Sequence, residues 1–437
     1  METIDHLIHA KWIITCEDTN RVLENHALAI KGKNIIAILP SSEAAKKYKA
    51  ASEHHYTTHA VMPGLINSHT HLAMNIFRGL ADDKELMDWL TNYIWPAEKK
   101  WVSRELVKDA SALAMAEMIR GGTTCFNDMY FFLEATAEAA DQAGIRAHIG
   151  MTVIDFPTAW ANTVDDYFAK GIAFYQAYKD HPRITATLAP HSTYTVSEKN
   201  LARVKALADE YHLKTNIHAH EAPQDVEGCL KLNHKRPLQC LQEVGLLSPQ
   251  LIAIHMTQLN DQDFALLQQH KPHIVHCPES NMKLASGTCP VEKLFQLGLN
   301  VALGTDGAAS NNDLDMIGEM RTAAFLAKLS TLDPKALPAE KVMRMATLNG
   351  AKALGIDTLT GSLVPGKAAD FIAIDLEQIE TQPLYHPISQ IVYASSRNQV
   401  TDVWVAGKQL LKNRELLTLD EKELIKKAQN WRKKIMN

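Results

Sequence analysis

The chain of 437 residues is 46% hydrophobic and 22% charged, which is the composition of an ordinary globular protein with a large buried core. Its net charge of -5 offers no basic surface, so the composition argues against a nucleic acid polymer or a membrane as partner. The six cysteines are scattered without a C-x-x-C pair, which argues against both a disulfide framework and a thiolate zinc cluster.

The first residues lack the features of a targeting segment. Glu2 and Asp5 stand where a signal peptide would carry positive charge, and no uninterrupted apolar run is long enough to span a bilayer. We therefore expect a cytoplasmic protein. We also expect it to assemble as a homo-oligomer, either a dimer or a tetramer.

Short apolar stretches separated by glycine-containing turns occur near both ends of the chain, which is the pattern of β-hairpins. They comprise residues 6–15, 27–39, 360–376 and 399–411. Neither end alone supplies enough apolar surface for a stable core. We therefore predict one small β-sandwich domain built from residues 1–58 plus 360–437, with an amphipathic helix at its C-terminal end.

Between these ends, short apolar stretches alternate with amphipathic helical patterns. The clearest helix is expected after Ser103, an N-cap residue, and stops at Gly121 and Gly122. The candidate strands are residues 60–67, 123–129, 146–153, 184–190, 214–220, 251–256, 273–278 and 300–306. Strand, helix and strand repeated eight times predicts an α/β fold, a (β/α)8 TIM barrel over residues 59–359.

A doubly wound open sheet is the competing fold for this alternation of strands and helices. It would be expected to carry a glycine-rich phosphate turn after an early strand. Neither G-x-G-x-x-G nor G-x-x-x-x-G-K-[ST] occurs in the chain. We therefore prefer the barrel.

Histidine and aspartate residues recur where the candidate barrel strands end. Because a barrel assembles its active site at the C-terminal ends of its strands, these side chains are expected to face one mouth. So many matching positions favour a shared site over separate packing roles. The residues are His69, His71, His191, His218, His220, His255 and Asp306.

The H-x-H pair at the end of the first barrel strand predicts a metal site. His69 and His71 share one face of an extended strand, and neutral imidazoles suit zinc. A catalytic zinc site adds about one or two further protein ligands and keeps a position open for water. His218 or His220, together with Asp306, would complete it, and strand alternation cannot choose between these two histidines. Glu221 would lie beside the metal and shuttle protons.

These motifs together resemble the amidohydrolase superfamily: H-x-H after Pro-Gly, HAHE at the fifth strand, a histidine at the sixth and TDG at the eighth. Residues 361–375 are similar to the small β segment that follows the barrel in that family. Within it, five stretches resemble the 5'-methylthioadenosine and S-adenosylhomocysteine deaminases, namely residues 66–83, 86–101, 189–197, 276–287 and 304–316.

The resemblance implies one zinc ion per subunit, and it selects His218 over His220. The ligands that it implies are His69, His71, His218 and Asp306. His220 would then be a hydrogen-bonded packing residue. One metal is expected because the fourth strand ends in Pro190 and His191, where binuclear members of the superfamily carry a bridging lysine.

The same resemblance assigns roles around the metal. Glu221 would deliver a proton to N1 of a purine, His255 would orient the attacking hydroxide, and Asp306 would take the water proton and contact the substrate. His191 would contact the nucleoside, and Glu98 would hold the ribose hydroxyls. Without the resemblance, Glu98 would be interpreted as a solvated helix carboxylate. The implied reaction is hydrolytic deamination of the adenine ring to the inosine analogue and ammonia.

The tail on the 5' carbon of the substrate is expected to be apolar. Family members that bind S-adenosylhomocysteine are expected to place arginines after the third strand, and residues 151–163 contain none. They offer Met151, Val153, Ile154, Phe156 and Trp160 instead. Methylthioadenosine is therefore expected to be preferred, with adenosine behind it, unless the fold brings one of four other arginines to the mouth: Arg78, Arg120, Arg146 or Arg183.

Two alternatives remain at this point. The first is a deaminase or hydrolase of another nitrogen heterocycle, such as guanine or a triazine. The second is a zinc-binding scaffold without catalysis. The cytidine-deaminase design is excluded, because the chain lacks an H-x-E paired with P-C-x-x-C.

Overall fold

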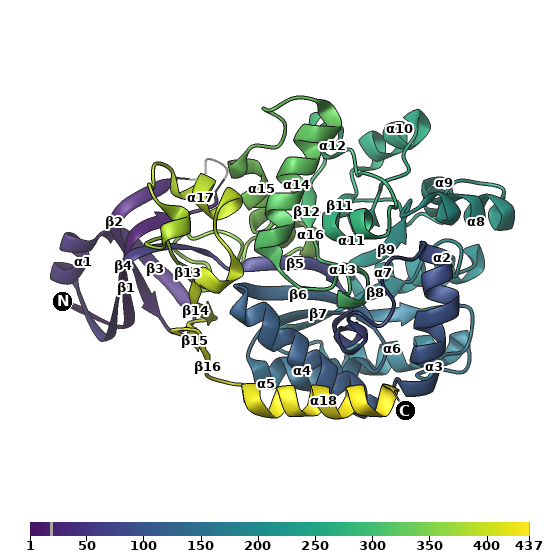
Figure 1. Ribbon diagram of the computed structural model, residues 1–437, viewed down its shortest axis with the longest axis horizontal. Helices are drawn as coiled ribbons and strands as arrows, with labels where there is room; N and C mark the ends of the chain where they lie inside the picture. The colour runs from purple at the N-terminus through teal and green to yellow at the C-terminus, as the bar shows by residue number, and fades with distance from the viewer. Residues whose placement is uncertain (18–20, 437) are drawn as a thin grey trace.

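The computed structural model describes residues 1–17 and 21–436, and the strands in these ranges form two eight-stranded sheets. One sheet is made by both chain ends, and the other is the barrel, in which every strand pair is parallel. Figure 1 shows the first sheet at one end of the molecule and the helix-covered barrel beside it. The predicted fold class, a TIM barrel with a β domain from both chain ends, is confirmed. The boundaries placed at residues 58 and 360 stay a prediction.

The end-derived sheet has the strand order β16-β15-β14-β13-β4-β1-β2-β3. The N-terminal and C-terminal halves of this sheet meet where β13 pairs antiparallel with the last residues of β4. The strands are β1 (Glu2–Ile14), β2 (Val22–Lys31), β3 (Asn34–Pro40), β4 (Tyr48–Pro63), β13 (Phe371–Asp375), β14 (Val400–Val405), β15 (Lys408–Lys412) and β16 (Glu415–Leu416). The sheet therefore depends on both ends of the chain.

The barrel strands follow one another around the barrel in chain order. They are β5 (Leu65–Thr70), β6 (Thr123–Tyr130), β7 (Arg146–Val153), β8 (Ile184–Pro190), β9 (Thr215–Ala219), β10 (Leu251–His255), β11 (His273–His276) and β12 (Val301–Leu303). The first differs from its expected range, because residues 60–63 end β4 and β5 begins only at Leu65. Gly64 makes this change of sheet possible, since a Cβ there would lie 2.1 Å from Thr124.

Helices cover the outside of the barrel, as Figure 1 shows. The helix predicted after Ser103 is α4 (Arg104–Arg120), whose first turn is capped by the Ser103 hydroxyl accepting from Leu106 N. The other long barrel helices are α5 (Leu133–Ala143), α6 (Val164–Tyr178), α7 (Glu198–Tyr211), α8 (Pro223–Asn233), α10 (Asp261–His270) and α14 (Met316–Thr331). The C-terminal helix α18 (Glu421–Met436) runs along α4, and Trp431 donates to Asp109 at 3.0 Å.

Shorter helices fill the loops. Those on the N-terminal side of the chain are α1 (Ser41–Lys47), η1 (Leu72–Phe77), α2 (Leu86–Trp89), the π-helical turn η2 (Leu90–Ile94) and α3 (Trp95–Trp101). The later ones are α9 (Pro237–Glu243), α11 (Pro278–Lys283), α12 (Val291–Gln296), α13 (Ala308–Asn311), α15 (Ala339–Met345), α16 (Leu348–Leu354), η3 (Ile379–Thr381), α17 (Pro387–Tyr393) and η4 (Arg397–Gln399). No helix among the described residues combines the length and apolar character needed to cross a bilayer.

The barrel closes between its last strand β12 and its first strand β5. The backbone nitrogen of Asp306 donates to the His69 carbonyl at 3.0 Å, and Thr305 N donates to the Asn67 side chain at 3.0 Å. Gly304 allows this approach, because a Cβ there would lie 2.8 Å from the backbone nitrogen of His69. The closure therefore brings two of the predicted metal residues together.

Candidate active site

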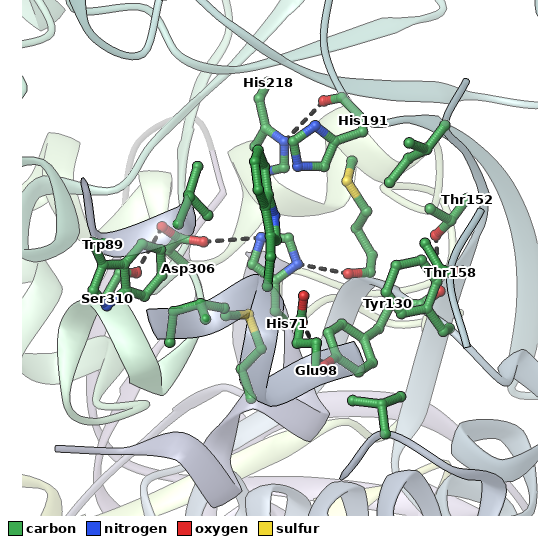
Figure 2. A pocket seen from close by; sticks show the side chains of 18 of the residues that line it. His71, Trp89, Glu98, Tyr130, Thr152, Thr158, His191, His218, Asp306 and Ser310 are labelled. Atoms are coloured by element: carbon green, nitrogen blue, oxygen red, sulfur yellow. Dashed lines mark hydrogen bonds and ion pairs between the residues drawn. The ribbon is translucent and has the colours of Figure 1, made fainter. Parts of the chain in front are cut away.

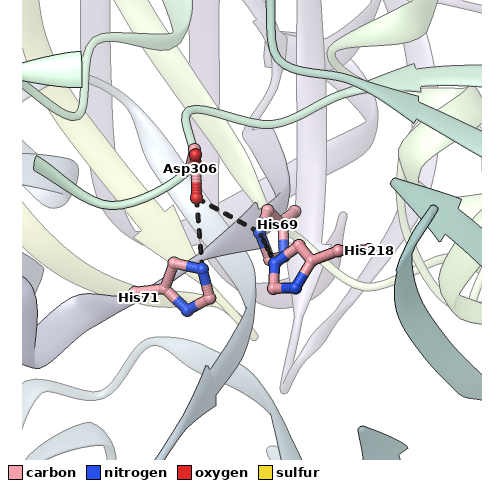
Figure 3. A group of neighbouring side chains, drawn as sticks. All are labelled: His69, His71, His218 and Asp306. Atoms are coloured by element: carbon pink, nitrogen blue, oxygen red, sulfur yellow. Dashed lines mark hydrogen bonds and ion pairs between the residues drawn. The ribbon is translucent and has the colours of Figure 1, made fainter. Parts of the chain in front are cut away.

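Four side chains converge at the C-terminal ends of β5, β9 and β12 (Figure 3). Asp306 Oδ1 lies 3.3 Å from His69 Nε2 and 3.2 Å from His71 Nε2. His218 Nε2 lies 3.1 Å from His69 Nε2. Zinc bonds of about 2.0–2.2 Å in a tetrahedron place ligand atoms roughly 3.3–3.5 Å apart. These spacings therefore fit one ion.

Backbone carbonyls orient two of the imidazoles. His71 Nδ1 lies 2.6 Å from the Met129 carbonyl, and His218 Nδ1 lies 2.8 Å from the His191 carbonyl. Because a carbonyl oxygen only accepts, each Nδ1 carries the proton, and the lone pair of each neutral ring is on Nε2. Those lone pairs point to the same centre as the Asp306 carboxylate, which is the donor set of a divalent cation.

Burial and mutual hydrogen bonds shift the pKa values of all four residues. Burial lowers the pKa of His69 to about 4 and lowers that of His218 well below its usual value. Burial alone would raise the pKa of Asp306, but hydrogen bonds with His69 and His71 hold it well below its usual range. For His71, the hydrogen bond with Asp306 outweighs the effect of burial and raises the pKa to about 9. A cation bound here would compete with that proton.

The backbone explains why His218 joins the centre and His220 does not. β9 ends at Ala219, and His220 adopts a left-handed conformation with φ of 54°. The alternation of an extended strand therefore stops before His220, so the two histidines do not share a face. The choice that strand alternation left open is made by this turn.

His220 is buried among protein partners away from the centre. Its Nδ1 lies 3.0 Å from the Gln258 carbonyl, and its Nε2 accepts from Leu238 N at 3.3 Å. Burial lowers its pKa to about 4, which favours this neutral state. The bonds match the hydrogen-bonded packing role expected for His220.

Two further predicted residues, Glu221 and His255, lie beside the centre. Their side chains and that of Asp306 offer ligand atoms within 4.8 Å of one another. Glu221 Oε1 lies 3.7 Å from His255 Nε2, while His255 Nδ1 lies 2.8 Å from Asn281 Oδ1. Burial raises the pKa of Glu221. A carboxyl with a raised pKa is suited to taking up and releasing a proton near neutral pH.

Sequence reasoning gave no role to the hydroxyls that hold the second oxygen of Asp306. Ser280 donates to Asp306 Oδ2 at 2.6 Å, and Ser310 donates to it at 3.0 Å. Both bonds leave Oδ1 facing the histidines. Ser280, Asn281 and Ser310 fall within the matching stretches 276–287 and 304–316, so the signal was present without an assigned function.

Comparisons with known proteins identify the family of this chain. The amidohydrolase family model matches residues 60–410. The chain belongs to the amidohydrolase family. This family is metal-dependent, and the cluster of His69, His71, His218 and Asp306 is the candidate metal site of this amidohydrolase.

Individual amidohydrolases are similar over nearly the whole chain. A 5-methylthioadenosine/S-adenosylhomocysteine deaminase of Teredinibacter turnerae is 46% identical over 433 residues, covering 99% of this chain and 98% of the relative. The crystal structure of an adenosine deaminase from Xanthomonas campestris with bound zinc has a TM-score of 0.98 at 46% identity, and covers 100% of this chain and 99% of that one. The crystal structure of an atrazine chlorohydrolase from Arthrobacter aurescens TC1 has a TM-score of 0.91 at 21% identity, and covers 98% of this chain and 99% of that one. At this identity the likeness shows the fold alone.

The candidate metal site of this amidohydrolase opens into a cavity of about 470 Å³, a volume suited to a small molecule (Figure 2). Glu98 of α3 lines it, and Tyr130 donates to Glu98 Oε1 at 2.6 Å. Burial raises the pKa of Glu98 to about 7. Glu98 is therefore a cavity carboxylate, and the solvated helix residue suggested by sequence alone is wrong. His191 also lines the cavity, with Nδ1 2.9 Å from Thr195 Oγ1.

Most of the cavity wall is apolar. Of the five residues expected there, Ile154 and Phe156 line it, whereas Met151, Val153 and Trp160 do not. Six further apolar side chains of the wall come from the helical segment after β5, namely Leu86, Trp89, Leu90, Ile94, Trp95 and Val102. Sequence reasoning gave these side chains no role, although residues 86–101 are one of the matching stretches.

The four arginines that the fold might have brought to the mouth are paired elsewhere. Arg78 pairs with Glu117, Arg120 with Glu421, Arg146 with Asp370 and Arg183 with Asp141. Among the described residues that line the cavity none is arginine, and Lys99 is the lysine at its wall. The described wall of the cavity therefore has no guanidinium group, just as residues 151–163 contain no arginine.

The contrast between His218 and His220 gives a matched pair of variants. We expect His218→Ala to lower the bound metal per chain, because it removes a nitrogen aimed at the centre. His220→Ala is expected to keep the metal and to lower the free energy of unfolding by about 1–3 kcal/mol, because it leaves buried partners unpaired. Elemental analysis and denaturant unfolding measure the two effects. Full metal occupancy in His218→Ala would contradict the assignment.

Proposed function

We propose that this amidohydrolase is a zinc-dependent deaminase of purine nucleosides, with 5'-methylthioadenosine as its preferred substrate. The observation that carries the proposal is the cluster of three histidines and one aspartate beside Glu221, open to a cavity whose wall is mostly apolar. The printed names of the Teredinibacter relative and the Xanthomonas neighbour, both 46% identical, support the same reaction.

In this proposal one zinc ion per chain is held by His69, His71, His218 and Asp306. Two imidazoles whose Nδ1 atoms are held by backbone carbonyls, a buried third and a carboxylate form a borderline donor set that suits zinc. The ion would supply a Lewis acid that makes a water molecule a nucleophile near neutral pH. The buried carboxylate of Asp306 balances part of its charge.

The reaction would add the oxygen of water to C6 of the adenine ring, protonate N1 and release ammonia, leaving the inosine analogue. Glu221 would hold and move the proton at N1, which its raised pKa suits. His255, oriented by Asn281, would hydrogen-bond the attacking oxygen. Asp306 would take the proton that the water loses, while Ser280 and Ser310 keep its second oxygen fixed.

Glu98 and His191 would position the nucleoside. Glu98 lies on the cavity wall with one oxygen accepting from Tyr130, so its other oxygen is available to accept from ribose hydroxyls. His191 lines the cavity and is tied to Thr195 through Nδ1, so its Nε2 would make the contact with the nucleoside. These contacts would fix the sugar while Glu221 fixes the base.

The mostly apolar wall of the cavity favours a thioether on the 5' carbon. Among the described cavity residues Lys99 is the basic side chain and none is an arginine, so the carboxylate of a homocysteine tail would lack a bidentate guanidinium partner. Ile154, Phe156 and Trp95 offer apolar contacts instead. The homocysteine tail of S-adenosylhomocysteine is therefore expected to be accommodated less well.

Two other functions are less well supported. A deaminase or hydrolase of guanine or a triazine would share the fold, but the neighbour named for atrazine chlorohydrolysis is only 21% identical. A zinc-binding scaffold without catalysis would not need a buried acid such as Glu221 facing an open cavity. Oligomer formation and cytoplasmic location stay predictions from the sequence.

Replacing Glu221 separates proton transfer from metal binding. Glu221→Gln is expected to keep bound zinc and to lower kcat for methylthioadenosine by about 10²–10⁴-fold, the usual contribution of a positioned general acid or base. Glu227→Gln, an exposed change six residues along, is the matched control and should retain full activity. Loss of zinc from Glu221→Gln would instead make Glu221 a ligand.

Replacing Glu98 distinguishes a nucleoside substrate from a free heterocycle. Glu98→Ala is expected to lower kcat/KM for nucleosides by about 10–100-fold, since hydrogen bonds to a charged group contribute about 1.5–3 kcal/mol. Turnover of a free base should change little. The exposed Glu105 provides the control variant Glu105→Ala. An equal loss on both substrate classes would favour the heterocycle hydrolase.

The proposal as a whole is tested by ammonia release from methylthioadenosine, adenosine, S-adenosylhomocysteine, guanine and a triazine. We expect kcat/KM to be highest for methylthioadenosine, with adenosine about 5–150-fold lower, because a methylene-sized group in an apolar pocket is worth about 1–3 kcal/mol. S-adenosylhomocysteine turning over as well as methylthioadenosine would refute the substrate assignment. If the zinc-loaded protein releases no ammonia from any nucleoside, the proposed deaminase activity is refuted.

A further inference from the structure

Two histidines and a glutamate on the end-derived sheet form a second group of metal-ligating side chains. The group includes no residue of the barrel. His9 lies in β1, and Glu53 and His55 lie in β4. Each offers one ligand atom, and these atoms all lie within 4.8 Å of one another. None of the three lines the catalytic cavity.

The pairing of the two strands creates this group. β1 and β4 run parallel, and His9 is the register partner of His55. Glu53 precedes His55 by two residues, so both side chains point to the same face of the sheet. The imidazole rings of His9 and His55 are stacked with centroids 4.8 Å apart, and His55 Nε2 lies 3.6 Å from Glu53 Oε2.

We propose that His9, Glu53 and His55 bind a second divalent transition-metal ion of the zinc, nickel and copper class. Imidazole is a preferred ligand of all three metals, and water would complete the coordination. Ligand atoms around a tetrahedral ion lie roughly 3.3–3.5 Å apart, which the His55–Glu53 pair already approaches. The side chains of His55 and Glu53 are 60% and 50% exposed, so they are able to turn toward the ion.

The charges around the group favour a cation. Burial and the neighbouring His55 lower the pKa of His9, which keeps its imidazole neutral and able to donate a lone pair. Glu53 supplies one negative charge, and its Oε2 lies beside His55 Nε2. The bound ion would tie β1 to β4, the strand that leads through Gly64 into β5.

The opposite face of the same two strands provides an internal contrast. His6 and His54 also come close there, with ring centroids 5.8 Å apart. Both rings pack against Trp404, at 4.9 Å and 5.0 Å. That pair is packed against an aromatic ring, whereas the His9 group is open and includes a carboxylate.

The test counts metal ions on the whole protein and does not depend on its activity. Protein loaded with zinc at the catalytic centre is dialysed against micromolar Zn²⁺, and bound zinc per chain is measured by elemental analysis. We expect two ions in the wild type and one in His55→Ala and in His9→Ala. His26→Ala, which removes a nearby histidine outside the group, should keep two.

A second measurement is needed in case the His9→Ala variant, which loses a half-buried side chain, does not fold. Glu53→Gln alters an exposed side chain, and we expect it to weaken the second zinc at least tenfold in a titration. Copper(II) bound at the second position should show nitrogen couplings in its electron paramagnetic resonance spectrum that change in His55→Ala. One zinc per wild-type chain, or a second zinc retained by His55→Ala, would overturn the proposal.

Discussion

The hydrogen bond from the backbone nitrogen of Asp306 to the His69 carbonyl is the interaction on which the site depends. It joins the last barrel strand to the first, two segments more than 200 residues apart, and so places a carboxylate beside two histidines. The junction tolerates no side chain at residue 304, because a Cβ would lie 2.8–3.0 Å from atoms of His69. Barrel closure and assembly of the candidate metal centre are therefore one event.

Burying so many ionisable groups is costly unless each has a partner. The structure distributes these partners around the centre: Ser280 and Ser310 bind the outer oxygen of Asp306, and Asn281 binds His255. The remaining lone pairs and charge face inward. Such an arrangement is stabilised by a cation, which explains why a barrel with this interior would be metal-dependent.

The cavity wall combines polar and apolar side chains. Glu98, His191 and Glu221 supply carboxylate and imidazole groups, while tryptophan, leucine and isoleucine side chains from residues 86–102 supply apolar surface. A molecule with a polar base and sugar and an apolar tail matches this combination. The four arginines considered do not add positive charge to the wall, because each is paired with a carboxylate elsewhere.

The sequence by itself determined the barrel and most of the site. Alternation of apolar stretches and helices needs only local order, and a barrel turns every strand end toward one mouth, so His69, His71, His255 and Asp306 were predictable. Tertiary structure decided between His218 and His220, because a left-handed residue after β9 ended the alternation. It also decided the environment of Glu98, the hydroxyls that hold Asp306 and the pairing of His9 with His55. Each of these depends on which distant segments meet, and that follows from packing and register, which local sequence patterns do not encode.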